Sequence, residues 1–85
     1  MMSVIELQRI NGSWDHTDSE LAKLLVKIGF VQDQAQVSSH NDVSLTQLIV
    51  DSIHEKHSKE VDKLKLILRK AKNWVKKQLK LQKAN

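Results

Sequence analysis

Cysteine and proline are both absent from this 85-residue chain, which has only two glycines and three aromatic residues. Without cysteine there can be no disulfide, no thiolate metal site and no cysteine nucleophile. No apolar run is long enough to span a membrane, and the N-terminus, which carries Glu6, lacks the pattern of a signal peptide. These absences predict a soluble cytoplasmic protein without disulfides.

What remains is the composition of a helical globular protein. Hydrophobic residues make up 40% of the chain and charged residues 28%, which is typical of a folded domain rather than a disordered segment. A chain of this length forms one domain with a single core. We therefore expect an all-α fold, a small bundle of four helices in one domain over residues 1–85. The first helix should be short, and the last long and basic.

The charges are divided unevenly along the chain. Residues 1–58 carry four basic and eight acidic side chains, whereas residues 59–85 carry ten basic and two acidic ones. The first part therefore has a net charge of −4 and the second a net charge of +8. Such asymmetry is typical of a basic helix that lies on an acidic bundle, or of one that meets an acidic partner or a phosphate backbone.

The first two helices are predicted from Ser3 to Ile10 and from Asp18 to Ile28. Thr17 and Glu20 have the spacing of a capping box at the start of the second helix. Gly29 is placed to end that helix, because glycine adopts the left-handed conformation that closes many helices. Phe30 should then fold back against the helix. The apolar residues that recur at i, i+3, i+4 and i+7 on its inner face are Leu21, Leu24, Leu25 and Ile28.

Two further helices are predicted in the second half. A polar segment from Gln32 to Asn41 should connect them to the first two as a loop with room for one helical turn. Ser44 and Gln47 form another capping-box pattern, and Ser58 is the candidate N-cap of the last helix. One continuous helix from Ser44 to Lys80 is the alternative. The inward positions of the last helix are Val61, Leu64, Ile67, Leu68, Ala71, Trp74, Val75 and Leu79.

A turn and a tryptophan stand between the first two helices. Asn11 and Gly12 form a dipeptide that tolerates positive φ, so the chain should turn there. Trp14 follows at once, and such a large aromatic should pack into the core and set the angle between the two helices. The predicted structural anchors are Gly12, Trp14, Leu21, Leu25 and Trp74.

The stretch from Leu7 to Leu25 resembles the start of the C-terminal helical domain of the vault poly(ADP-ribose) polymerase and of proteins that pair a VIT domain with a von Willebrand A domain. The run from Leu68 to Leu79 is similar to that family's closing helix, with Ala71 and Trp74 in its K-A-x-x-W pattern. The middle, Phe30 to Asn41, is shorter and more polar than in the family. The residues that match at the start are Leu7, Gln8, Asn11, Gly12, Ser13, Trp14, Glu20, Leu21 and Leu24.

The resemblance implies a protein-interaction module. In the vault polymerase this domain docks onto the major vault protein and delivers its host into the vault particle, and none of the polymerase's ADP-ribosyl chemistry belongs to it. We therefore expect a non-catalytic docking domain, with the major vault protein as the implied partner. A lysine-rich nucleic-acid-binding domain and a purely structural C-terminal cap of a von Willebrand A protein are the alternatives.

The histidines raise a metal hypothesis. His54 and His57 are spaced i, i+3, and Asp51 lies one turn before them. Zinc, however, is held by three or four convergent ligands, and the remaining ligands would have to come from polar loops. No nucleophile motif, glycine-rich phosphate loop or carboxylate pair has the setting that catalysis requires. We expect exposed histidines, no enzyme activity and no cofactor.

The last helix also carries the predicted binding surface. Its basic face fits a solvated surface, an acidic protein partner, or a nucleic acid or anionic lipid. The near absence of arginine and of interleaved aromatics argues against nucleic acid, and the apolar side of the helix is already needed for the core rather than for a membrane. The partner-binding candidates are Leu66, Arg69, Lys70, Lys77 and Leu81.

Overall fold

The computed structural model describes residues 2–83, and over that range the chain is all-α, as predicted. The α-helices are α1 (Met2–Glu6), α2 (Ser19–Lys27), α3 (Gln34–Ser38), α4 (Asp42–Lys56) and α5 (Lys65–Lys83), and a 3-10 helix, η1 (Ser58–Glu60), precedes α5. The additional helix relative to the predicted bundle is α3, a single turn in the segment expected to connect the two halves. No helix in this part of the chain is long and apolar enough to cross a membrane.

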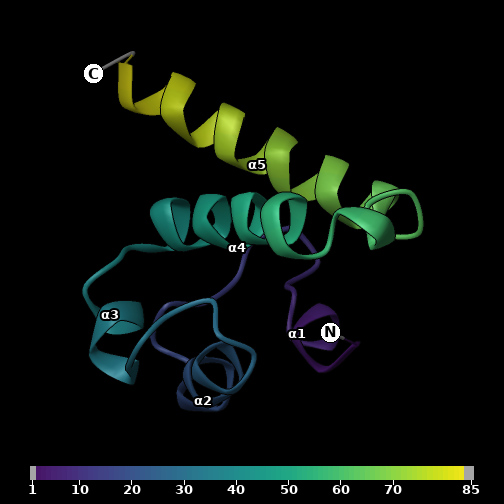
Figure 1. Cartoon of the computed structure of the whole chain (residues 1–85). Helices are drawn as coiled ribbons and strands as arrows, with labels where there is room; N and C mark the ends of the chain where they lie inside the picture. Colours follow the sequence, from purple (N-terminus) through teal and green to yellow (C-terminus); the bar gives the residue numbers. More distant parts are fainter. Residues whose placement is uncertain (1, 84–85) are drawn as a thin grey trace.

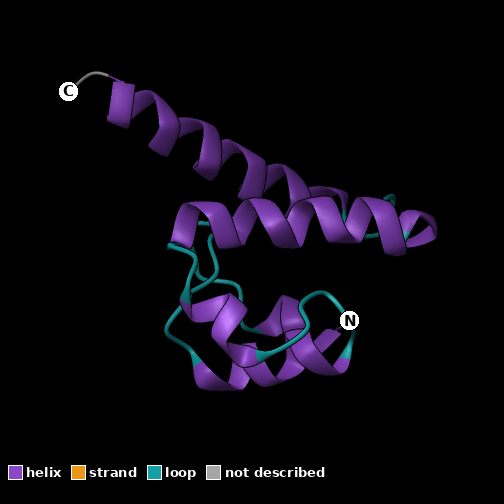
Figure 2. Ribbon diagram, turned by 60° about the vertical axis from the view of Figure 1, so that its left-hand side comes forward, coloured by secondary structure: helices purple, strands orange, loops and turns teal. Residues whose placement is uncertain are grey.

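The helices α1 to α4 form one layer, which we call the α1–α4 layer, and α5 packs on the other side of α4. In Figure 1, α4 runs through the middle, with α1, α2 and α3 on one side and α5 on the other. Figure 2 shows the same order from another direction. In both views α5 lies close to α4 at its N-terminal end and diverges from it toward the C-terminus. One buried cluster spans both sides of α4: it joins residues of α1–α4 to Leu64, Leu68 and Ala71. Of α5, the first half closes this core.

Trp14 is at the centre of this core and is fully buried. Its indole Nε1 donates to the Val4 carbonyl oxygen at 2.8 Å, and its backbone N–H donates to the Thr46 hydroxyl at 3.1 Å. A buried tryptophan thus has both of its N–H groups satisfied. Since Val4 belongs to α1 and Thr46 to α4, this one residue joins the first helix, the inter-helix segment and the central helix.

The ends of α2 show one wrong and one confirmed prediction. Asp18, not Thr17, is the N-cap, because its carboxylate accepts from the backbone N–H groups of Glu20 and Leu21. The Thr17 hydroxyl instead donates to Asp15 at 2.6 Å, so it is not available to cap the helix. At the other end Gly29 has a φ of +83°, as predicted for a closing glycine. Phe30 and Val31 fold back and are buried.

The starts of α3 and α4 are set by Asp33 and Asn41. The Asp33 carboxylate accepts from the Gln36 N–H, and α3 buries Val37. For α4, the capping box is formed by Asn41 and Ser44 rather than by the predicted Ser44 and Gln47. The helix begins earlier than the sequence suggested because the Asn41 side chain accepts from the Ser44 N–H at 2.8 Å.

The break between the last two helices is confirmed, but its position differs from the prediction. The backbone leaves helical geometry at His57, where φ is −129° and ψ is 41°. Ser58 then opens only the 3-10 turn and makes no side-chain capping hydrogen bond, so it does not cap the long helix. A further turn over residues 61–64 separates η1 from α5. One continuous helix is therefore excluded.

Candidate protein-docking site

Helix α5 presents three kinds of surface around its axis. Residues four or three apart lie on the same side of a helix, and this spacing separates the exposed side chains into two rows. We name as the basic flank the exposed row Lys65, Arg69, Lys72, Lys76 and Lys80. We name as the outer row the exposed residues Leu66, Lys70, Asn73, Lys77 and Leu81. A third, uncharged side is half-buried and consists of Ile67, Trp74 and Gln78.

The structure divides the predicted binding residues between these surfaces. Leu66, Lys70, Lys77 and Leu81 all lie in the outer row, whereas Arg69 lies on the basic flank. Leu66 is 77% exposed and Leu81 53% exposed, so both leucines extend into solvent among the lysines. The basic face predicted from the sequence is therefore divided into two rows. Of these, the outer row carries the exposed leucines, and the basic flank carries none.

The positive charge of α5 is not neutralised by ion pairs among the described side chains. Among the described side chains, the ion pairs are Arg9 with Asp42, His16 with Asp42, and His57 with Glu60. None of them involves α5. The carboxylates of the α1–α4 layer therefore leave the basic flank free to attract acidic groups from outside.

A turn in the N-terminal segment holds α5 in place. Gly12 has a φ of +99°, and a Cβ placed on it would lie 2.6 Å from the Lys70 carbonyl oxygen. Only glycine allows both this backbone conformation and this close approach. Beside it, the Gln8 amide donates to the carbonyls of Gly12 at 2.9 Å and of Ile67 at 3.3 Å. This segment therefore sets where the uncharged side of α5 lies.

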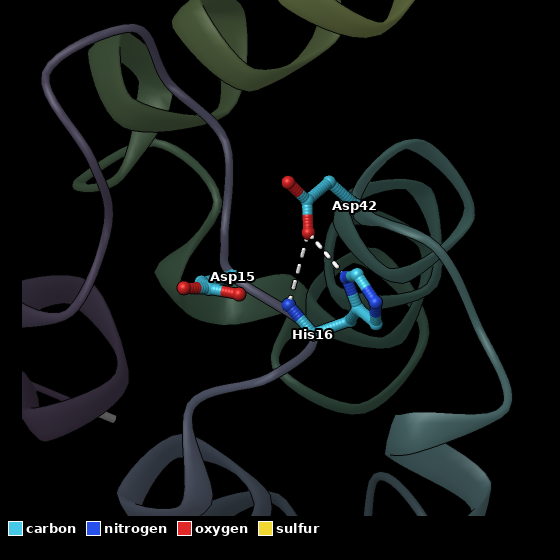
Figure 3. Close-up of side chains that lie close together, drawn as sticks. All are labelled: Asp15, His16 and Asp42. Carbon is cyan, nitrogen blue, oxygen red and sulfur yellow. Dashed lines mark hydrogen bonds and ion pairs between the residues drawn. The ribbon is translucent and has the colours of Figure 1, made fainter.

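Asp42 carries the most highly connected carboxylate of the described chain. One of its oxygens accepts from the His16 backbone N–H at 3.0 Å and lies 2.6 Å from the His16 Nδ1 (Figure 3). The other oxygen accepts from the Arg9 guanidinium. Burial tends to raise the pKa of this carboxyl, but the hydrogen bonds from His16 and Arg9 lower the pKa to about 2.

This cluster is a clamp rather than a cation site. Asp15, His16 and Asp42 are the one group of three potential metal ligands within the described residues. Both Asp42 oxygens are already engaged, and the guanidinium of Arg9 supplies the positive charge that a metal would bring. The arrangement ties the segment before α2 to the first residue of α4. Asp51, His54 and His57, whose spacing raised the metal hypothesis, do not form such a group among the described residues.

Three apolar side chains on or near α5 differ in exposure from the sequence prediction. Leu79, predicted to face inward, is 46% exposed, because α5 has diverged from α4 by that point. Trp74 is half-buried rather than fully buried like Trp14. Ile10 was predicted to end the first helix. In the structure it is 92% exposed and lies in the turn that contacts α5. The position of Ile10 directly before the Asn-Gly turn is the feature of the sequence that indicates its exposure.

A von Willebrand factor A domain-containing protein of Dictyostelium discoideum is similar to this chain, with 29% identity over 79 residues. The aligned stretch is 93% of this chain but only 9% of that protein, so the chain spans a small part of its relative's length. No family model matches the sequence. No solved structure matches it. The similarity agrees with the resemblance to proteins that contain a von Willebrand A domain, and it leaves the vault polymerase supported by the sequence pattern alone.

Proposed function

We propose that this chain is a non-catalytic interaction domain that docks onto an acidic protein surface through α5. The observation that carries the proposal is the unneutralised charge of α5: its basic flank and outer row form no ion pair with the described acidic side chains. Lysines spread over a long helix raise the rate at which an oppositely charged partner is encountered. Docking, unlike catalysis, needs no enclosed pocket with convergent reactive groups.

The resemblance suggests the identity of the partner. Similarity to a von Willebrand A protein supports a place for the domain inside a longer host, and in the resembling vault polymerase the corresponding domain binds the major vault protein. We therefore propose the major vault protein as the first partner to test. In this arrangement the domain binds the vault particle non-covalently and carries its host with it.

Surface plasmon resonance on immobilised vault particles tests the proposal. Reversing the charges in the outer row with Lys70→Glu and Lys77→Glu should mainly slow association, and Leu66→Ser should mainly speed dissociation. The matched control is the pair Lys23→Glu and Lys27→Glu, which changes the same number of charges on the exposed face of α2. If wild-type chain does not bind vault particles, the vault assignment is wrong. If it binds and the α5 variants behave like the control, docking uses another surface.

A nucleic-acid partner is the rival proposal, since the five side chains of the basic flank lie in one row. Its signature is electrostatic: the logarithm of the affinity for duplex DNA falls linearly with the logarithm of salt concentration, with a slope of about −0.9 for each phosphate contacted. Titration of generic duplex at several salt concentrations would therefore separate the two functions. Protein docking predicts a partner whose binding survives moderate salt, with only weak and steeply salt-dependent binding to the duplex.

A further inference from the structure

A groove opens where α5 diverges from α4. Leu68 and Ala71 of α5 belong to the main core cluster, whereas Val75, one turn further along, does not. Toward the C-terminus of α5 the two helices separate in both views (Figures 1 and 2). Leu79, which is 46% exposed, faces α4 across a groove of about 520 Å³, with the buried Val75 at its base and the half-buried Val43 and Leu48 on the α4 side. Polar side chains of α4 also line the groove, and Leu79 with Val43 and Leu48 forms its apolar patch.

The two walls of this groove carry opposite charges. On the α4 wall lie Asp51 and Glu55, both exposed. On the α5 side the basic flank borders the groove, since Lys72 lies three residues before Val75 and Lys76 three residues before Leu79. No ion pair joins the two walls among the described side chains. Asp51 accepts a hydrogen bond from the Gln47 amide at 2.8 Å, but the charges of both walls remain without an ionic partner among the described side chains.

The outer row by itself is a poor hydrophobic centre. Leu66 and Leu81 are fifteen residues apart, which is about 22 Å along a helix, and lysines and an asparagine lie between them. Stable interfaces have a contiguous apolar centre surrounded by a polar rim. The groove supplies such a centre, and the basic flank beside it supplies one side of the rim.

We propose that the groove between α4 and α5 is the seat of an amphipathic helix from a protein partner. The apolar side of that helix packs on Leu79 and on Leu48 of α4, its acidic flank faces Lys72 and Lys76, and its basic or neutral flank faces Asp51. A third helix laid along two others extends the packing already present in the bundle. The inference rests on the proposed docking function, and it adds where the partner binds and what kind of segment it presents.

A second copy of this chain does not fit as the occupant. Within the described residues, three of its four large exposed apolar side chains, Leu66, Leu79 and Leu81, lie on its own α5. That helix would bring lysines against the lysines of the basic flank. Like charges placed across an interface oppose association. The charge pattern of the two walls instead selects a helix with one acidic flank.

The proposal is tested with a synthetic probe and the whole chain. The probe is an amphipathic peptide of about 18 residues, five helical turns, with leucines on one side, glutamates on one flank and glutamines on the other. A matched peptide replaces every glutamate by lysine. In amide NMR spectra of the chain, the glutamate peptide should shift the signals of residues 43–55 and 72–80. The lysine peptide should leave them in place.

Two leucine variants locate the binding. Leu79→Ser should weaken the binding of the glutamate peptide by about three- to tenfold, since the leucine is 46% exposed and only that part of its surface is left to bury. Leu66→Ser is the matched control on the outer row, on the opposite side of α5 from the groove. It should leave the affinity of this short peptide unchanged, since only a whole partner is large enough to contact the outer row as well. Both side chains are substantially exposed, so neither variant should prevent folding.

The outcomes separate this inference from the docking function. If the glutamate peptide shifts signals at Leu66, Lys70 and Lys77 and tolerates Leu79→Ser, then α5 docks partners through its outer row and the groove proposal is wrong. If neither peptide binds, the groove proposal is wrong, while the vault-particle measurement still decides the docking function. If both peptides bind equally well, the groove takes apolar helices without regard to charge, and the proposed acidic partner is rejected.

Discussion

The α1–α4 layer and helix α5 are held in the molecule by different kinds of contact. In the layer, polar side chains cross between segments: Trp14 bonds to α1 and α4, and Asp42 ties His16 and Arg9 to the start of α4. Helix α5 is attached mainly by buried apolar residues, and the one side-chain hydrogen bond that reaches it in the described chain ends on the Ile67 backbone carbonyl. The polar atoms of α5 are consequently available for other molecules, whereas those of the layer are committed to the fold.

This difference predicts that substitutions in the layer lower stability, whereas substitutions on the exposed rows of α5 change binding. The largest effect should come from Trp14→Ala. It leaves a large cavity and removes the bond to Val4, at a cost of about 3 to 5 kcal/mol. In a domain this small such a loss should abolish cooperative thermal unfolding, as followed by circular dichroism. Trp74→Ala, at the half-buried position on α5, is the matched control and should still melt cooperatively. Equal losses in the two variants would remove the distinction between the regions.

The two glycines allow a sharper test of how α5 is attached. Gly12→Ala combines an unfavourable φ of +99° with a clash against the Lys70 carbonyl, whereas Gly29→Ala has a φ of +83° and nothing within 4 Å of its Cβ. The backbone conformation alone costs about 1 to 2 kcal/mol, so Gly29→Ala should lose that amount. Gly12→Ala should lose clearly more, because α5 must shift away. Urea unfolding of both variants measures the difference, and equal midpoints would mean that the turn does not position α5.

The Asp42 clamp should make the stability of the layer depend on pH. Its pKa of about 2 in the folded chain lies below the ordinary value of 3.8. The stabilisation from the charged carboxylate is therefore fully present above pH 3.8 and is lost as the pH falls through about 2. Asp42→Asn should cost about 1 kcal/mol at neutral pH and should flatten the fall in melting temperature over this range. Asp18→Asn is the control, since asparagine caps a helix as well as aspartate. If this control flattens the curve equally, the pH dependence does not come from the clamp.

Much of the fold could be predicted from the sequence because it follows from local patterns. The apolar spacing of α2, its closing glycine and the break before α5 all depend on residues close together in the chain. Local patterns do not determine which of two adjacent residues caps a helix. Thr17 and Asp18 both have capping chemistry, and Asp18 caps α2 because the Thr17 hydroxyl donates to Asp15 instead. The same holds for Asn41 and Ser44, which cap α4 together.

The candidate site could be predicted only in part. Residue types alone identified a basic helix with exposed leucines, but the division of its surface into two rows depends on which side faces α4. The exposure of Leu79 depends on the angle between α4 and α5, which is a property of tertiary packing that no local pattern encodes. The clamp joins Arg9, His16 and Asp42 from distant positions, so only the folded chain brings it together.

The smallest expected effect concerns the basic flank, where a substitution should slightly stabilise the domain. Lys76 has a lysine four residues away on either side, Lys72 and Lys80, and like charges at this spacing repel by about 0.2 to 0.5 kcal/mol per pair. Lys76→Glu replaces both repulsions by attractions of similar size. Because these side chains are exposed, the lower end of the range applies, and the free energy of unfolding should rise by about 0.8 kcal/mol at low salt and return to the wild-type value in high salt. Urea unfolding at two salt concentrations measures this, and Lys23→Glu on α2 serves as the control for the change in net charge. A loss of stability in Lys76→Glu would mean that the lysine already has a partner within the fold, and the contrast between a committed layer and a free helix would not hold at this position.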